Sequence, residues 1–285
     1  MKVSIIGHGF VGKALENGLK EKVETLIIDP IYNNKISDLN EFAPEIIFIC
    51  VPTPMSDDGH QNINILNNVV EEINEVDINP QIVVKSTILP SNLLRIKKLI
   101  PNVIYNPEFL TERNAFEDFI NSELIIFGGN INDTKNLSIF YKNYTKCKTK
   151  EHIMTDLISS SLIKYTINSF LASKVIFFNE IFNLFNKSQS SETWMNFINA
   201  ISKDTRIGYS HMLVPGPDGR LGFGGACFPK DTEAFLVFFE ENKKSFSLLA
   251  EAIKVNNNLR RDYSDLLDRE REQNITFKSG KGFND

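Results

Sequence analysis

One glycine-rich segment, GFGGACFPKD at 222–231, contains the residue best suited to covalent chemistry. Cys227 comes just before Pro229, which favours the first turn of a helix. A thiol at that position faces the positive end of the helix dipole, which lowers its pKa and favours the nucleophilic thiolate. Asp231 follows four residues later, and the three glycines let the backbone approach a ligand. The segment therefore predicts a reactive cysteine with a carboxylate near it.

A lysine and an amide, Lys164 and Asn168, interrupt an otherwise apolar stripe upstream of this segment. Their spacing of four places both on one face of a helix. A polar pair buried without partners would be costly, so the two side chains either face solvent or line a site. In a site, a lysine and an amide can stabilise a developing oxyanion. The residues alone leave both interpretations open.

A second glycine-rich segment, GHGFVG at 7–12, follows an apolar run and opens a helical pattern. Glycines at these positions allow a tight turn, the approach of a pyrophosphate to the helix N-terminus and close packing of the helix on the strand. Asp29 ends the next apolar run, where its carboxylate can bind an adenosine ribose and would repel the extra phosphate of NADP. The pattern predicts NAD, with His8 facing solvent; the alternative is that the glycines merely cap a turn. The predicted contacts are Gly7, Gly9, Phe10, Val11, Gly12 and Asp29.

Three further motifs lie at the carboxyl ends of predicted strands: VPTP at 51–54, Ser86 with Thr87, and NPEFLTE at 106–112. Ligands of a doubly wound sheet bind beyond the carboxyl ends of its strands, so these motifs are expected to line the cofactor crevice. Glu108 and Glu112 offer carboxylates, although a single glutamate is more often a solvated surface acid. The predicted lining residues are Val51, Pro52, Thr53, Ser86 and Thr87.

The first half of the chain shows the alternation of strand and helix patterns that is typical of an α/β domain. Short apolar runs alternate with longer segments of helical spacing, which predicts a Rossmann-like, doubly wound parallel sheet. From about residue 154 to 185 the pattern is one long helix, and the second half is helical. We therefore expect an NAD-binding domain at 1–150 and a helical dimerisation domain at 151–285. The predicted strands are 3–6, 25–28, 46–51, 82–86, 103–105 and 124–128, and the later helices are 192–203, 230–240 and 246–269.

Composition excludes several classes of protein. A chain of 285 residues with a formal net charge of -5 has no general attraction for nucleic acid or anionic lipid. Its three cysteines form no paired framework, which argues against disulfides and a metal site and favours a reducing compartment. We expect Cys50 to be buried and Cys147, in a lysine-rich run, to be exposed. The first apolar run is too short for a signal peptide, so a cytoplasmic protein is expected.

Together with the SLIKYTINSFLASKVIFFNEI helix and the VNNN segment near Asn256, these motifs resemble the UDP-glucose/GDP-mannose dehydrogenase family. The resemblance covers about residues 1–260 and is greatest to the members that oxidise UDP-glucose. It implies a four-electron oxidation of a primary alcohol to a carboxylate with two NAD, here UDP-glucose to UDP-glucuronate. An aldehyde forms first, Cys227 adds to it as a thiohemiacetal, a thioester follows, and water releases the acid.

The same resemblance implies roles for matching residues. Cys227 would be the nucleophile, Lys164 and Asn168 would hold the oxyanion, and Asp231 would position a water. Arg206 matches an arginine that reaches the sugar site of the neighbouring subunit, which implies a homodimer through the helical domain. Thr87 and Glu108 would assist proton transfer and hydrolysis, Glu112 would lie near the reacting sugar, and the substrate contacts would include Glu108, Phe109, Leu110, Phe223, Gly224 and Gly225.

Two departures from the family pattern leave alternatives open. The segment VPGPDGR at 214–220 is an insertion expected to turn beside the substrate. The third domain, which holds the nucleotide of the substrate in the family, is not found before the polar tail at 274–285. The chain could therefore be a non-catalytic NAD-binding or assembly module, or act on GDP-mannose. A two-domain reductase of the 6-phosphogluconate or 3-hydroxyisobutyrate dehydrogenase type is disfavoured, because such an enzyme needs no thiol like Cys227.

Overall fold

The computed structural model describes residues 1–263 and 265–278. Its contacts divide the chain into two compact units. The first combines Met1–Thr53 with Gln61–Lys164, and the second combines Pro54–His60 with the chain from Tyr165 onward. Residues 279–285 of the expected polar tail lie outside the described residues.

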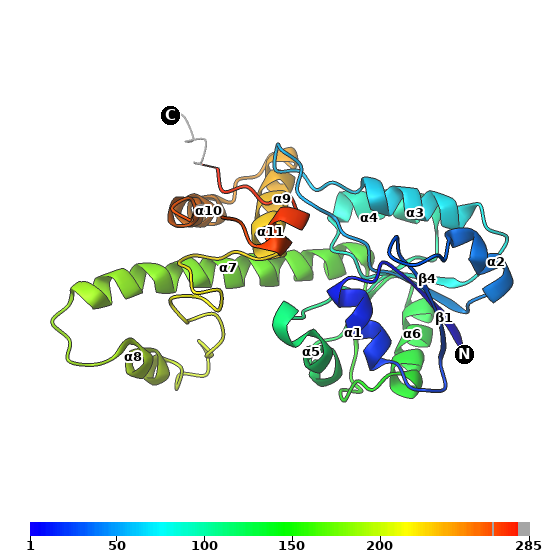
Figure 1. Cartoon of the computed structure of the whole chain (residues 1–285), viewed down its shortest axis with the longest axis horizontal. Helices are drawn as coiled ribbons and strands as arrows, with labels where there is room; N and C mark the ends of the chain where they lie inside the picture. Colours follow the sequence, from blue (N-terminus) through cyan, green and yellow to red (C-terminus); the bar gives the residue numbers. More distant parts are fainter. Residues whose placement is uncertain (264, 279–285) are drawn as a thin grey trace. The chain divides into compact units, whose positions relative to one another are not determined.

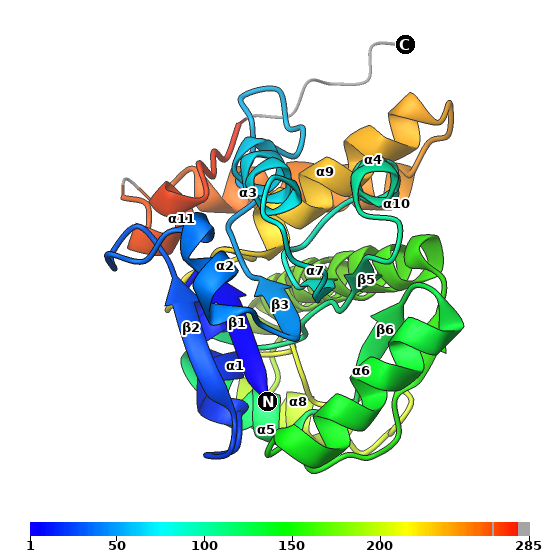
Figure 2. The same cartoon turned by 90° about the vertical axis from the view of Figure 1, so that its right-hand side faces the viewer.

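A seven-stranded sheet forms the centre of the first unit, in the order β2-β1-β3-β4-β5-β6-β7 (Figures 1 and 2). Its described strand pairs are parallel except for β5 and β6, which meet antiparallel at Tyr105 and Gly128. The predicted Rossmann-like sheet is therefore confirmed, as a mostly parallel one. The strands are β1 (Lys2–Ile6), β2 (Glu24–Ile28), β3 (Ile46–Ile49), β4 (Gln81–Val84), β5 (Ile104–Tyr105), β6 (Ile126–Gly128) and β7 (Ile153–Thr155).

Helices cover both faces of this sheet (Figure 2). Side chains alternate across a strand, so Ile47 and Ile49 of β3 join one apolar cluster while Ile46 and Phe48 join another. The first cluster includes residues of α3 (Asn64–Asn74) and α4 (Pro90–Leu99). The second includes residues of α1 (Phe10–Gly18), α5 (Ala115–Asn121) and α6 (Ile131–Tyr144). Burial on both faces explains why the strands read as continuous apolar runs. Shorter elements are α2 (Leu39–Phe42) and the 3₁₀ turns at Ile36–Asp38 and Glu112–Asn114.

The start of the long helix differs from the prediction. Residues 153–155 form β7, and α7 begins after it and spans Leu157–Lys187. Asp156 explains the boundary, because its carboxylate accepts hydrogen bonds from the Ser159 amide at 2.9 Å and the Ser159 hydroxyl at 2.6 Å. Met154, which was predicted to lie in the helix, instead pairs with Phe127 of β6.

The second unit is helical, as predicted. The buried Ala172 and Ile176 of α7 pack with Phe223 and Ala252, and Phe178 packs with Ile198 in a neighbouring cluster. The helices after α7 are α8 (Trp194–Ile201), α9 (Phe228–Glu241), α10 (Ser247–Arg260) and α11 (Asp268–Glu272).

The predicted helix at 246–269 is too long, because α10 ends at Arg260. No glycine or proline marks this end in the sequence. Long-range contacts stabilise the break: the Tyr263 hydroxyl accepts the Leu221 amide at 2.9 Å, and Glu270 of α11 accepts the Gly225 amide at 3.0 Å.

Burial of the cysteines matches one prediction and contradicts another. Cys50 is 8% exposed and Cys147 only 2%. Cys147 was expected to be exposed in its lysine-rich run, but its thiol packs with Phe119 and Tyr141 and donates to the Phe119 carbonyl at 3.3 Å. Within the described residues, no helix is long and apolar enough to cross a membrane, and no three metal-binding side chains are grouped.

Candidate functional site

The cofactor loop, defined as residues 7–12, has a backbone that only glycine permits at two positions. Gly7 has φ +91°, and a Cβ there would lie 2.8 Å from backbone atoms of Cys50. A Cβ at Gly12 would lie 2.2 Å from the Gly7 carbonyl oxygen. Gly9 is the N-cap of α1; no described side chain caps this helix end, and the space beside Gly9 is open. The first amides of α1 therefore present the donors that a pyrophosphate requires.

Asp29 lies beside this loop in a fixed orientation. Its carboxylate accepts the His8 amide at 2.7 Å and the Ile31 amide at 3.1 Å. A carboxylate held in this way can accept hydrogen bonds from the hydroxyls of an adenosine ribose. The cofactor loop and Asp29 together therefore fit NAD. His8 was expected to face solvent, but it is only 8% exposed because its ring lies between the side chains of Glu16 and Tyr32.

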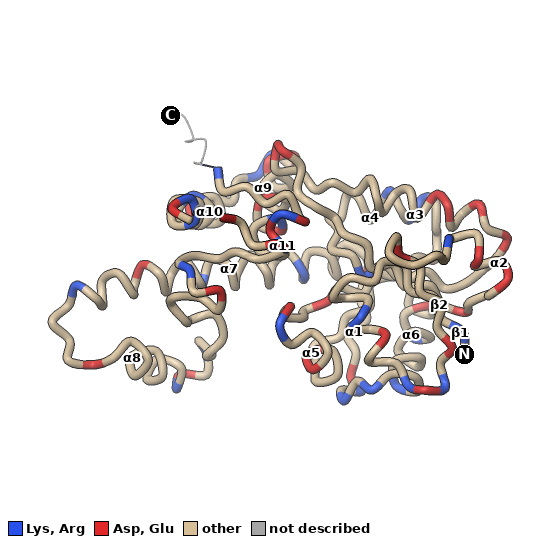
Figure 3. The backbone as a smooth tube through the Cα atoms, in the orientation of Figure 1, with Lys and Arg blue, Asp and Glu red and all other residues tan. Residues whose placement is uncertain are grey.

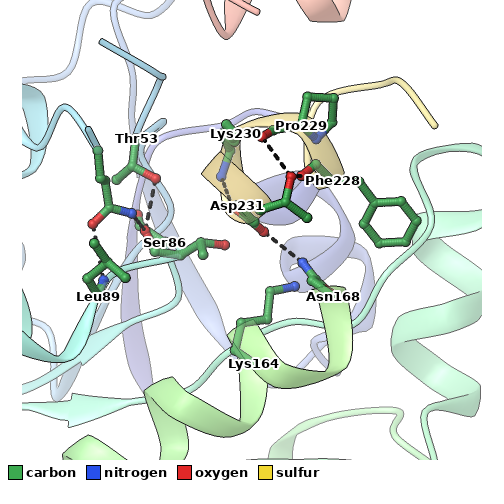
Figure 4. Close-up of polar contacts among 12 residues, drawn as sticks. Thr53, Ser86, Leu89, Lys164, Asn168, Phe228, Pro229, Lys230 and Asp231 are labelled. Carbon is green, nitrogen blue, oxygen red and sulfur yellow. Dashed lines mark hydrogen bonds and ion pairs between the residues drawn. The ribbon is translucent and has the colours of Figure 1, made fainter. Parts of the chain in front are cut away.

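The hydroxyls at the strand ends brace the loops that contain them. Thr53 donates to the Thr87 carbonyl at 2.9 Å (Figure 4). Ser86 donates to the Val51 carbonyl at 2.7 Å. Gln61, which the sequence analysis missed, donates to the Thr87 carbonyl and accepts the Leu89 amide. These bonds fix the two predicted lining segments to each other.

Glu108 and Lys164 form a buried ion pair in the first unit. The Lys164 ammonium lies 3.0 Å from Glu108 Oε1 and also donates to the Glu108 carbonyl, while Leu110 donates its amide to Oε2 at 2.8 Å. Both side chains are at most 5% exposed, which rules out the reading of Glu108 as a solvated surface acid. Burial alone would raise the pKa of Glu108, but the charges of Lys164 and Lys85 and the Leu110 amide together hold it below its usual value.

Lys85 supports this pair from the end of β4 and was also missed. It is 3% exposed and donates to the Asn106 side-chain oxygen at 2.9 Å, two residues before Glu108. Burial lowers the pKa of Lys85. A charged lysine within the apolar strand predicted at 82–86 was the available signal.

Replacing Lys164 with methionine is expected to destabilise the fold in a pH-dependent way. The lowered pKa of Glu108 stabilises the native chain above its ordinary value of 4.5, and this contribution is lost as the pH falls through the folded pKa. Without Lys164, burial raises the pKa of Glu108 above its ordinary value. The buried Glu108 then favours the native state only while it is protonated at low pH, and the native state loses stability as the pH rises. Relative to the wild type, the free energy of unfolding of Lys164→Met should be lower by about 3–5 kcal/mol near neutral pH.

Urea unfolding at pH 4, 5, 6 and 7 measures this effect. The deficit of Lys164→Met should grow with pH, whereas the exposed control Lys148→Met should show a small and constant difference. A deficit of Lys164→Met that stays constant with pH would contradict the coupling to Glu108.

The second unit contains the cysteine loop, defined as residues 222–231. Cys227 is partly exposed and is the N-cap of α9, with Pro229 in the first turn, as predicted. The Asp231 amide donates to the Cys227 carbonyl at 2.9 Å, so the helix starts at the cysteine. The thiol thus lies at the positive end of the α9 dipole, which stabilises a thiolate.

Asp231 is held by two side chains. It is 1% exposed; Oδ1 accepts from Lys230 at 2.6 Å and Oδ2 accepts from the Asn168 amide at 2.7 Å (Figure 4). The open question about Asn168 is resolved, because it is buried and bonded rather than solvent-facing. Lys230 was not singled out in the sequence, although its place next to Asp231 in FPKD was a signal.

Most of the glycines in the cysteine loop make room for the chain's own side chains. A Cβ at Gly222 would lie 2.5 Å from the Asn256 oxygen, and one at Gly224 would lie 2.4 Å from Glu270. Gly225, with φ +78°, has open space beside it. At Gly222 and Gly224 the absent Cβ thus leaves room for Asn256 and Glu270, and the approach of the loop backbone to a ligand stays a prediction.

The insertion at 214–220 takes part in the same packing. Its Asp218 accepts from the Arg260 guanidinium at 2.6 Å, and Arg260 also donates to the Gly222 carbonyl at 3.0 Å. Glu270 lies 3.9 Å from the same guanidinium. Arg260 and Glu270 are buried, although α11 itself carries acidic and basic residues in alternation (Figure 3). The insertion thereby braces the cysteine loop.

The other predicted residues lie at varied positions. Glu112 is exposed in a 3₁₀ turn. The ring of Phe109 lies 5.2 Å from the Lys164 ammonium. The Arg206 side chain is 88% exposed and pairs with Asp204 at 2.6 Å, while Lys174 holds its loop by donating to the carbonyls of residues 207 and 208.

Comparison with known proteins decides the family. The model of the UDP-glucose/GDP-mannose dehydrogenase family, NAD binding domain, matches residues 15–147, and that of the central domain matches residues 158–258. The chain belongs to the UDP-glucose/GDP-mannose dehydrogenase family. Membership supports NAD as the cofactor, in agreement with the fit of the cofactor loop and Asp29.

Individual relatives agree with this family. A UDP-glucose 6-dehydrogenase of Rickettsia felis is 34% identical over 253 residues, covering 85% of this chain and 53% of the relative. The chain thus spans about half the length of the curated relatives that it matches. A UDP-glucose dehydrogenase structure from Pyrobaculum islandicum has a TM-score of 0.76 at 25% identity, covering 91% of this chain and 68% of that one. Mycobacterium tuberculosis 3-hydroxyisobutyrate dehydrogenase shares the fold at 16% identity, with a TM-score of 0.70 over 93% of this chain and 95% of that one.

Proposed function

We propose that this chain is an NAD-dependent nucleotide-sugar 6-dehydrogenase that converts UDP-glucose to UDP-glucuronate. The observation that carries the proposal is the partly exposed Cys227 at the start of α9, four residues before a buried carboxylate fixed by Lys230 and Asn168. An alcohol dehydrogenase that stops at the aldehyde needs no thiol. Oxidation to the acid does, because the aldehyde must be held as an adduct that can be oxidised again.

NAD, when bound, would accept a hydride twice, once from the alcohol and once from the thiohemiacetal. Cys227 Sγ forms a bond to the aldehyde carbon, and the carbonyl electron pair moves to oxygen, where Lys164 and Asn168 stabilise the charge. After the second oxidation leaves a thioester, water adds to its carbonyl carbon, the C–S bond breaks and the thiolate of Cys227 leaves.

A carboxylate must accept the proton of that water. Glu108 is suited to this role because its lowered pKa keeps it ionised at neutral pH, and Lys164 fixes it in place. Asp231 is the second candidate and is oriented by Lys230 and Asn168. Asn168 would thus act twice: it orients Asp231, which positions the water, and it helps to bind the oxyanion.

Stoichiometry tests the proposed reaction. With NAD and UDP-glucose, the chain should form two NADH per sugar and release UDP-glucuronate, and the same assay with GDP-mannose measures sugar choice. One NADH per sugar would contradict oxidation to the acid. Calorimetry with UDP-glucose tests the alternative of a non-catalytic module, which would bind NAD and no nucleotide sugar.

We also infer that the chain forms a homodimer through α7. Phe170, Phe177 and Leu184 are 58–66% exposed, and their spacing of seven places them along one face of the helix. A row of large apolar side chains in water is typical of an interaction surface. In such a dimer the exposed Arg206 would serve the sugar site of the partner.

Replacing Phe177 with glutamate should therefore convert a dimer to a monomer. Sedimentation velocity measures the change, and Ile139→Glu, at a site on α6 that is 55% exposed, is the matched control and should leave the dimer intact. A monomeric wild type, or equal dissociation by both substitutions, would refute the interface.

A further inference from the structure

Three side chains outside the proposed reaction meet beside the cofactor loop. The ring of His8 is held at both nitrogens: Nε2 lies 2.7 Å from Glu16 Oε2 on α1, and Nδ1 lies 2.8 Å from the Tyr32 hydroxyl after β2. The two rings meet edge to face with centroids 5.4 Å apart. His8 thus connects the loop after β1, the helix α1 and the segment after β2.

The directions of the hydrogen bonds determine what Tyr32 offers to a ligand. The Nε2–H tautomer of His8 donates to the Glu16 carboxylate and leaves Nδ1 as an acceptor for the Tyr32 O–H. With its proton directed at His8, the Tyr32 oxygen presents lone pairs to other partners. Tyr32 is 42% exposed as a residue, and its hydroxyl is held by His8.

Tyr32 lies close along the chain to the acid that fits the ribose. Asp29 bonds to the amide of the same His8 whose ring holds Tyr32, and it bonds to the Ile31 amide next to Tyr32. The segment therefore places two hydrogen-bond acceptors, a carboxylate and an oriented phenol oxygen, at one edge of the cofactor loop.

We propose that Tyr32, oriented by His8, is a specificity-determining residue that accepts a hydrogen bond from the adenosine ribose and disfavours a 2′-phosphate. The two ribose hydroxyls can donate one to each acceptor, whereas a phosphate offers only acceptor oxygens and negative charge. His8 is a positioning residue, because without it the Tyr32 proton can turn outward and donate to a phosphate. The inference concerns cofactor choice and is independent of the oxidation proposed for the sugar.

Calorimetric titration of NAD and NADP, without sugar, tests this inference. Tyr32→Phe removes the oxygen without changing the ring and should weaken NAD binding roughly fivefold, with little change for NADP. Tyr209→Phe, at a tyrosine that is 45% exposed, is the matched control and should leave both affinities unchanged. An unchanged NAD/NADP affinity ratio in Tyr32→Phe overturns the proposal, as does a wild type that binds no NAD.

The role of His8 requires a second set of variants. His8→Ala should lower the NAD/NADP affinity ratio, and His8→Asn should restore it in part because its side-chain oxygen can accept from Tyr32 near the position of Nδ1. In the Tyr32→Phe background, His8→Ala should cause no further fall in the ratio. An equal fall in both backgrounds shows that His8 acts independently of Tyr32 and overturns the positioning role.

Discussion

A chain carrying Cys227→Ala is expected to release no uronate, with a loss of turnover of roughly 10³-fold or more, while NAD affinity stays within about twofold. The loss follows because no other group in the described cysteine loop can form the carbon–sulfur adduct that the second oxidation requires. Assays of NADH and of the acid product measure the effect, and NAD titration shows that the cofactor loop is intact.

The other two cysteines supply the control. Burial raises the pKa of Cys50 to about 12 and also raises the pKa of Cys147, so neither thiol is a nucleophile near neutral pH. Cys147→Ala should keep its turnover. Iodoacetamide followed by mass spectrometry should label Cys227 first and the buried pair only after unfolding. Full turnover by Cys227→Ala would contradict the proposed mechanism.

Arg260→Met is expected to lower the free energy of unfolding by about 3–5 kcal/mol. The substitution keeps most of the side-chain volume but removes the cation between Asp218 and Glu270, and Glu270 is fully buried. It also removes the donor to the Gly222 carbonyl, so the cysteine loop loses a brace. Urea unfolding followed by circular dichroism measures the change.

Arg271→Met is the matched control on α11. Its side chain is 58% exposed and pairs with Asp268, and such a surface ion pair is worth at most about 1 kcal/mol. A similar loss in both variants would show that the buried network contributes no more than a surface pair. A loss in Arg260→Met alone would support the brace and, through it, the role of the 214–220 insertion.

Sequence patterns within a few residues were sufficient to predict the strands and helices that carry the candidate functional residues. The apolar runs predicted six of the seven strands. Five of these six are almost wholly buried, whereas the edge strand β2 is mostly half-buried but still apolar over Leu26–Ile28. The start of α9 at Cys227 followed from a proline in its first turn, and the cofactor loop followed from Gly7 and Gly12, where only glycine fits. Such signals lie within a few residues of the feature that they specify, so a sequence can show them.

Other features of the protein depend on contacts between residues that are distant in the sequence, and only the tertiary structure shows them. After the end of α10, Tyr263 bonds to Leu221 and Glu270 bonds to Gly225 of the cysteine loop, each more than 40 residues away in the chain. Burial of Cys147 arises from packing on Phe119, and burial of His8 arises from Tyr32, 24 residues later. The sequence by itself determined which residue types could do chemistry and which helix or strand each would follow. The fold decided how those groups are bonded and charged, because a hydrogen bond or a desolvated ion pair depends on distance in space and not on spacing along the chain.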